Sequence, residues 1–129
     1  MFNFFKDDTI KKQIEMQDNE TQERLIEALL LVTYADGKIK ISETESLEKI
    51  LDSVNWHEAF QYKGRFGEIM ANIRAALESE AKITGLVNGI VNLDKEKNAF
   101  IIKCCEKLAS ADGSVDATEK SIVERFRKS

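Results

Sequence analysis

The sequence predicts an all-α fold, a compact bundle of about seven helices that contains two pseudo-symmetric helix–loop–helix units. Composition is the first reason: the chain has no proline, 6 glycines and a charged fraction of 33%, which is typical of helices with solvated faces. The second reason is that apolar residues recur at helical spacing, and no stretch alternates long enough for a strand. The third is an internal repeat.

The repeat is centred on an Asp-Gly motif. Ala35-Asp36-Gly37, with Glu43 six residues after the glycine, returns as Ala111-Asp112-Gly113 with Glu119 at the same distance, an offset of 76 residues (111 − 35). Flanking positions match as well: Leu25, Ile26, Val32, Ile39, Ser42 and Leu47 correspond to Ile101, Ile102, Leu108, Val115, Thr118 and Val123. Each copy therefore predicts an apolar helix, an Asp-Gly stop, a short loop and a new helix that opens on an acid.

We expect a single domain over residues 1–129, since this length can bury one core. It divides into an N-terminal segment (1–18), a first repeat (21–54), connecting helices (55–93) and a second repeat (95–128).

The N-terminal segment predicts a short helix, because apolar residues follow one another at loose helical spacing. Two interpretations are open: it docks its aromatic side chains on the body, or it is an interfacial anchor with a modest basic face. The apolar residues are Phe2, Phe4, Phe5, Ile10 and Ile14, and the basic ones are Lys6, Lys11 and Lys12.

The first repeat opens with the strongest helix signal, from about Thr21 to Asp36. It is apolar on nearly all sides and therefore belongs at the centre of a bundle, and Gly37 is expected to end it. Ser42 and Glu45 form a capping-box pattern that opens the next helix.

The connecting region predicts short helical turns from Asn55 to about Gly67, beneath an aromatic cluster. Helical spacing then continues to Leu93, with a break at Ser79 or Gly85. The aromatic residues are Trp56, Phe60, Tyr62 and Phe66.

The second repeat predicts a long helix from Asp94 that Gly113 ends, and a short last helix from about Asp116. That last helix directs Ile122, Val123 and Phe126 towards the core.

Composition also excludes several classes of function. A net charge of −4 argues against nucleic acid as a partner, since nucleic-acid binding needs clustered positive charge. No apolar run is long enough to be a transmembrane segment, and the N-terminus lacks the pattern of a secretion signal, so we expect a cytoplasmic protein.

Cys104 and Cys105 lie on a helical stripe and are expected to be buried, inert thiols. His57 has no neighbour at zinc-ligand spacing.

The two Asp-Gly loops match half of a calcium-binding EF-hand. Asp36, Gly37, Ile39 and Glu43 fall on loop positions 5, 6, 8 and 12. Positions 1 and 3 need oxygen ligands, but they are Val32 and Tyr34 in the first copy and Leu108 and Ser110 in the second. The sequence therefore excludes a true EF-hand.

A looser cation site is compatible with the motif, with Asp36, Glu43, Asp112, Asp116 and Glu119 as the candidate metal ligands. Each loop supplies few ligands, so we expect weak binding of Ca²⁺, Mg²⁺ or Mn²⁺ that draws on both copies. The alternative is that these acids only cap helices and stabilise turns. That alternative explains acids near helix ends, but not the same acids at the same spacing twice.

These two motifs, in an all-helical chain of this size, resemble the TerB-like family of bacterial tellurite-resistance proteins, from about Thr21 to Arg127. The resemblance implies a non-catalytic accessory protein of tellurite or chemical-stress resistance, whose clustered acids bind a divalent metal. It also implies other stress-resistance proteins as partners, at the inner face of the membrane. The alternative function is a metal-free interaction module, co-chaperone-like or a scaffold of a membrane complex. We expect no enzyme, because no nucleophile–histidine set and no phosphate loop is present.

Overall fold

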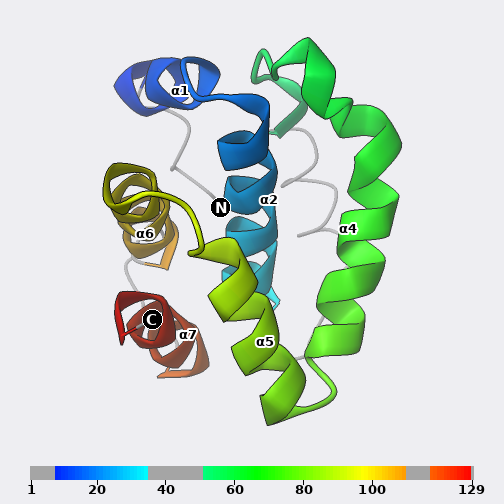
Figure 1. Ribbon diagram of the computed structural model, residues 1–129, viewed down its shortest axis with the longest axis vertical. Helices are drawn as coiled ribbons and strands as arrows, with labels where there is room; N and C mark the ends of the chain where they lie inside the picture. The colour runs from blue at the N-terminus through cyan, green and yellow to red at the C-terminus, as the bar shows by residue number, and fades with distance from the viewer. Residues whose placement is uncertain (1–7, 35–50, 110–116, 129) are drawn as a thin grey trace.

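Helix α2 (Asn19–Thr33) lies in the middle of the molecule, between α4 on one side and α6 on the other (Figure 1). The computed structural model describes residues 8–34, 51–109 and 117–128. Within these ranges the only regular elements are helices, which confirms the all-α prediction. The elements are α1 (Asp8–Glu15), α2, the 3₁₀ helix η2 (Glu58–Phe60), α4 (Tyr62–Ala76), α5 (Glu80–Ile90), α6 (Lys95–Ala109) and α7 (Ala117–Lys128). The total of about seven helices and the pseudo-symmetry of the repeats stay predictions.

The central position of α2 follows from its sequence. It packs against α4, α5, α6, α7 and η2, and its apolar side chains are fully buried on every side. Burying one Leu or Ile side chain stabilises a fold by roughly 1.5–3 kcal/mol, so this helix contributes a large share of the core. The fully buried residues are Leu25, Ile26, Ala28, Leu29, Leu30, Leu31 and Val32. The prediction of a central, all-round apolar helix is confirmed.

The two ends of α2 differ from the predicted ones. Asp18 caps the start, where its Oδ1 accepts a hydrogen bond from the Thr21 backbone N–H at 2.8 Å. The helix ends at Thr33, three residues before the predicted Asp36. Thr33 donates its hydroxyl hydrogen to the Leu29 carbonyl at 2.7 Å, and Thr is a weaker helix former than the leucines before it. Tyr34 is the C-cap residue, so the expectation that the helix reaches Asp36 was wrong.

Helix α6 repeats the buried stripe of α2 in a different environment. Ile101, Cys104 and Cys105 are fully buried, as are Leu25, Ala28 and Leu29 at the matching positions. The next two residues differ, because Glu106 and Lys107 are exposed in α6 where α2 buries Leu30 and Leu31. The two helices therefore share the spacing of their buried residues, although α2 is enclosed by the fold and α6 has one face in solvent.

The connecting region is more regular than the sequence indicated. Helix α4 already starts at Tyr62 and has 15 residues, so the prediction of short helical turns holds only for η2. The predicted break falls at Ser79, whose hydroxyl accepts the Lys82 backbone N–H at 3.1 Å and caps α5. Gly85 lies inside α5 and does not interrupt it.

The aromatic cluster predicted under this region is confirmed. Trp56 stacks on Tyr62, with ring centroids 5.2 Å apart. Phe60 meets both rings edge-on, and Phe66 meets Tyr62 edge-on. The Trp56 indole Nε1–H donates to the Leu51 carbonyl at 2.7 Å, which fixes the ring in place. The cluster thus joins the residues around Leu51 to the start of α4.

Both helices of the second repeat start close to the predicted residues. Asp94 caps α6 through its Oδ1, which accepts the Lys97 backbone N–H at 3.0 Å. Helix α7 starts at Ala117, one residue after the predicted Asp116. Its residues Ile122, Val123 and Phe126 are all buried, which confirms the predicted inward face.

The N-terminal helix α1 is attached by two apolar side chains and a buried polar contact. Ile10 and Ile14 are buried, and the Gln22 Nε2–H of α2 donates to the Ile14 carbonyl at 2.9 Å. Phe2, Phe4 and Phe5 lie outside the described residues, so the choice between docked aromatics and an interfacial anchor stays open. In the described part of the chain, none of the helices has the length and apolar character needed to cross a membrane.

Candidate metal centre

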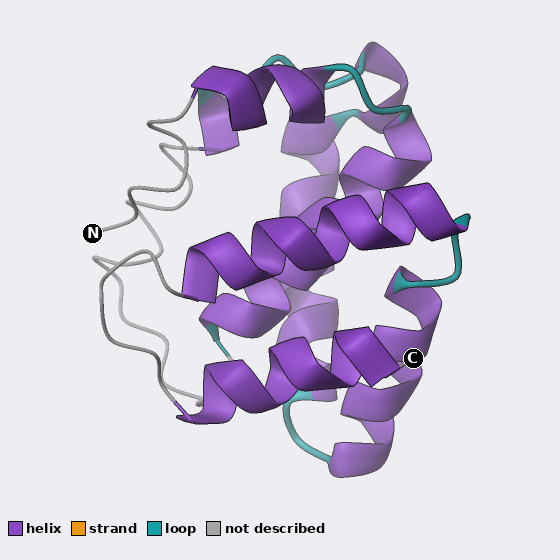
Figure 2. Cartoon of the chain, turned by 90° about the vertical axis from the view of Figure 1, so that its left-hand side faces the viewer, coloured by secondary structure: helices purple, strands orange, loops and turns teal. Residues whose placement is uncertain are grey.

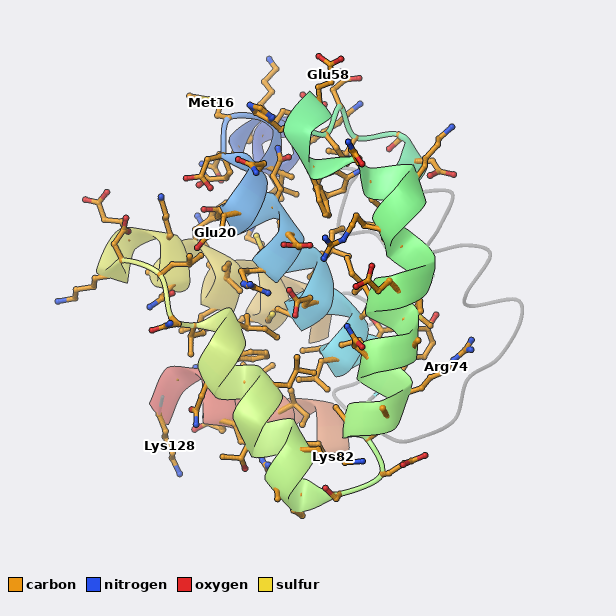
Figure 3. All side chains as sticks on the ribbon, turned by 45° about the vertical axis from the view of Figure 1, so that its right-hand side comes forward. Met16, Glu20, Glu58, Arg74, Lys82 and Lys128 are labelled. Carbon is orange, nitrogen blue, oxygen red and sulfur yellow. The ribbon has the colours of Figure 1, made fainter. Side chains whose placement is uncertain are left out.

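The helix ends that flank the two Asp-Gly motifs lie on one side of the molecule. The first motif follows the end of α2, and the second lies between the end of α6 and the start of α7. Figures 2 and 3 show these three helix ends on the same side. Helix α2 also packs directly against both α6 and α7. The fold therefore holds the helices that flank the two motifs in contact with each other.

The predicted ligands themselves fall mainly outside the described residues. Asp36, Glu43, Asp112 and Asp116 lie there, and so do Gly37, Gly113 and the Ser42–Glu45 capping box. Glu119 is the third residue of α7, in the first turn as the sequence predicted. A carboxylate in a first turn is favoured by the helix dipole, whether or not it also binds an ion. The convergence of the five carboxylates stays a prediction.

In the first copy, the residues at EF-hand loop positions 1 and 3 belong to the helix and its cap, where the sequence placed them. The residues at loop positions 1 and 3, Val32 and Tyr34, are both fully buried. Val32 lies in α2 and Tyr34 caps it. Neither side chain offers a carboxylate, and an EF-hand requires oxygen ligands at both positions. Any ion at this motif must therefore be held by a smaller ligand set.

The described part of the chain contains no group of three or more His, Cys, Asp or Glu residues placed to hold a metal ion. His57 is exposed, and its backbone N–H donates to the Gln22 Oε1 at 2.7 Å. Most of the predicted ligands lie outside the described ranges, so this observation does not bear on them.

Two acids of α2, Glu23 and Glu27, form ion pairs. Glu23 pairs with Arg65 of α4 at 2.5 Å, and Glu27 pairs with Arg24 on its own helix. Burial raises the pKa of the Glu27 carboxyl, against the opposing effect of Arg24. Glu23 therefore joins α2 to α4, and Glu27 is paired within α2; we do not count either among the candidate metal ligands.

A further ion pair joins the starts of the two repeated helices. Lys97 of α6 donates its Nζ–H to the Asp18 Oδ2 at 2.6 Å. This hydrogen bond, together with the one from the Thr21 backbone, lowers the pKa of Asp18 from 3.8 to about 2. The contact fixes the start of α6 against the start of α2, and it complements the apolar packing between the two helices.

The two cysteines are buried and free, as predicted. Desolvation raises the pKa of Cys104 to about 12, and it also raises the pKa of Cys105 well above its usual value. The thiolate is the form that ligates metals and attacks electrophiles. Their burial and raised pKa values therefore predict that both thiols react slowly in the folded protein.

The sequence analysis did not predict two polar features of the structure. One is Gln22, which is fully buried and bridges α1 to the backbone at His57. The other is a hollow of about 470 Å³ at the start of α4, lined by Asp52, Val54, Trp56, His57, Glu58, Gln61, Tyr62, Lys63 and Gly64. Gln61 has a left-handed backbone (φ 53°), which is uncommon for a residue other than glycine, asparagine or aspartate. The only sequence signal for Gln22 is that it is a polar residue on the apolar stripe of a helix. No sequence signal marks the left-handed backbone of Gln61.

The chain was compared with protein-family models, curated proteins and solved structures, and none of them matches it.

Proposed function

We propose that this chain is a non-catalytic accessory protein of tellurite or related chemical-stress resistance that binds a divalent cation between its two Asp-Gly motifs. The candidate ligands are Asp36, Glu43, Asp112, Asp116 and Glu119. The observation that carries the proposal is the duplication, in which the same acids recur at the same spacing after two matching helices. In this proposal the protein is cytoplasmic or peripheral to the inner membrane face, where it meets other stress-resistance proteins.

The packing of the repeated helices supports a shared site. A cation such as Ca²⁺ takes about 6–8 oxygen ligands, which is more than one of these loops supplies. Two loops can complete the shell only if their helices bring them together. The contacts of α2 with α6 and α7, and the position of the three helix ends on one side (Figure 2), are the arrangement that such a site requires.

The charges of the two segments favour the second motif as the stronger half of the proposed cation site. Residues 35–50 hold four Asp or Glu residues and three lysines, and residues 110–116 hold two aspartates and no basic residue. Together the two segments contribute −3 of the net charge of −4. Because Lys38 and Lys40 dilute the first motif and few ligands are available, we expect dissociation constants on the order of 10⁻⁴ M or weaker.

The test is a titration of the full chain with Ca²⁺, Mg²⁺ and Mn²⁺. Binding of the two diamagnetic ions, Ca²⁺ and Mg²⁺, is measured from amide NMR shifts. Binding should fall sharply in Asp112→Asn and Glu119→Gln, and less in Asp36→Asn and Glu43→Gln. Glu96→Gln is the matched control, because Glu96 is an exposed acid in the first turn of α6 outside the motifs. Equal binding by the control and the Asp112 variant would contradict the proposal.

The second candidate function is a metal-free interaction module. The observation in its favour is that this fold already uses acids as helix caps, at Asp18 of α2 and Asp94 of α6. If the acids of the motifs do the same, they need no ion. The absence of amide shifts at either motif at millimolar ion would favour this function over the first.

A further inference from the structure

We draw no further inference here: the strongest candidate, the surface patch of exposed small residues along α4 (Gly67, Ala71, Ala75) and along α5 (Ala81, Gly85, Gly89), has open space around its glycines, but nothing in the structure shows what covers it.

Discussion

Replacing Gln22 by Met should cost far more stability than its position in the sequence suggests. Gln22 is fully buried, and both ends of its amide are used. Its Nε2–H donates to the Ile14 carbonyl at 2.9 Å, and its Oε1 accepts the His57 backbone N–H at 2.7 Å. Met has nearly the same volume and shape, so the change removes the polar contacts without opening a cavity.

The size of the loss follows from what each partner retains. The Ile14 carbonyl still accepts the Gln17 backbone N–H at 3.1 Å, so only a net hydrogen bond of roughly 0.5–1.5 kcal/mol is lost there. The His57 amide loses the acceptor that Gln22 supplied, which costs about 1–3 kcal/mol. Together these losses come to about 1.5–4.5 kcal/mol. Because the His57 hydrogen bond is only partly buried, we expect the lower part of this range, a decrease of about 2–3 kcal/mol in the free energy of unfolding. With urea slopes of about 1–3 kcal/mol/M, the midpoint should fall by on the order of 1 M.

The assay is urea unfolding followed by circular dichroism, and Gln17→Met is the matched control. The Gln17 amide makes a single half-buried contact, to the Gln13 carbonyl one turn away at 3.2 Å. The control should lose less than about 1 kcal/mol. If Gln22→Met and Gln17→Met have equal unfolding free energies, the buried bridge does not hold α1 and the segment before α4 to α2, and the reasoning is refuted.

Three further predictions rest on other contacts. Cys104 and Cys105 should react slowly with a thiol reagent in the native state and quickly after denaturation, because both are buried with raised pKa values; fast native labelling would contradict this. The lowered pKa of Asp18 means that its pairing with Lys97 adds stability above the unfolded-state pKa of 3.8, and that this contribution is lost as the pH falls towards 2. Asp18→Asn, which can still cap α2, should flatten the acid limb of the stability curve between these pH values, and an unchanged limb would refute the pairing. Gly85→Ala should raise the unfolding free energy by about 0.5–1 kcal/mol, since a methyl group there meets open space and Ala is the better helix former; a destabilised variant would show that something packs against this position.

The helical core was predictable because its signal is local and repeated. The apolar spacing of α2, α6 and α7 identified the residues that are buried, among them Leu25, Ile101 and Phe126. The ends of helices were predicted less well, since α2 ends at Thr33 rather than at Asp36. An Asp-Gly pair marks a turn clearly, whereas the weaker helix-breaking effect of β-branched residues before it is easily outweighed in a sequence pattern.

Contacts between distant segments could not be read from the sequence. Gln22 pairs with a backbone group 35 residues away, and its place on the apolar stripe of α2 does not indicate that partner. Gln61 takes a left-handed conformation at the start of α4, for which glutamine has no intrinsic preference. The candidate ligands, in contrast, were found from a duplicated motif. Such a motif is visible in the sequence even when the residues that it faces are not known.

The most direct test of the proposed site is paramagnetic broadening by Mn²⁺ in an isotope-labelled full chain. A single ion held by both motifs must broaden amide signals near the end of α2 and near the α6–α7 connection at the same low Mn²⁺ concentration, because the effect falls steeply with distance. Excess Mg²⁺ or Ca²⁺ should restore both sets of signals, and Asp112→Asn should remove both effects together. Broadening that is confined to one motif, or that is scattered over the exposed acids of the helices, would contradict a cation site shared by the two copies.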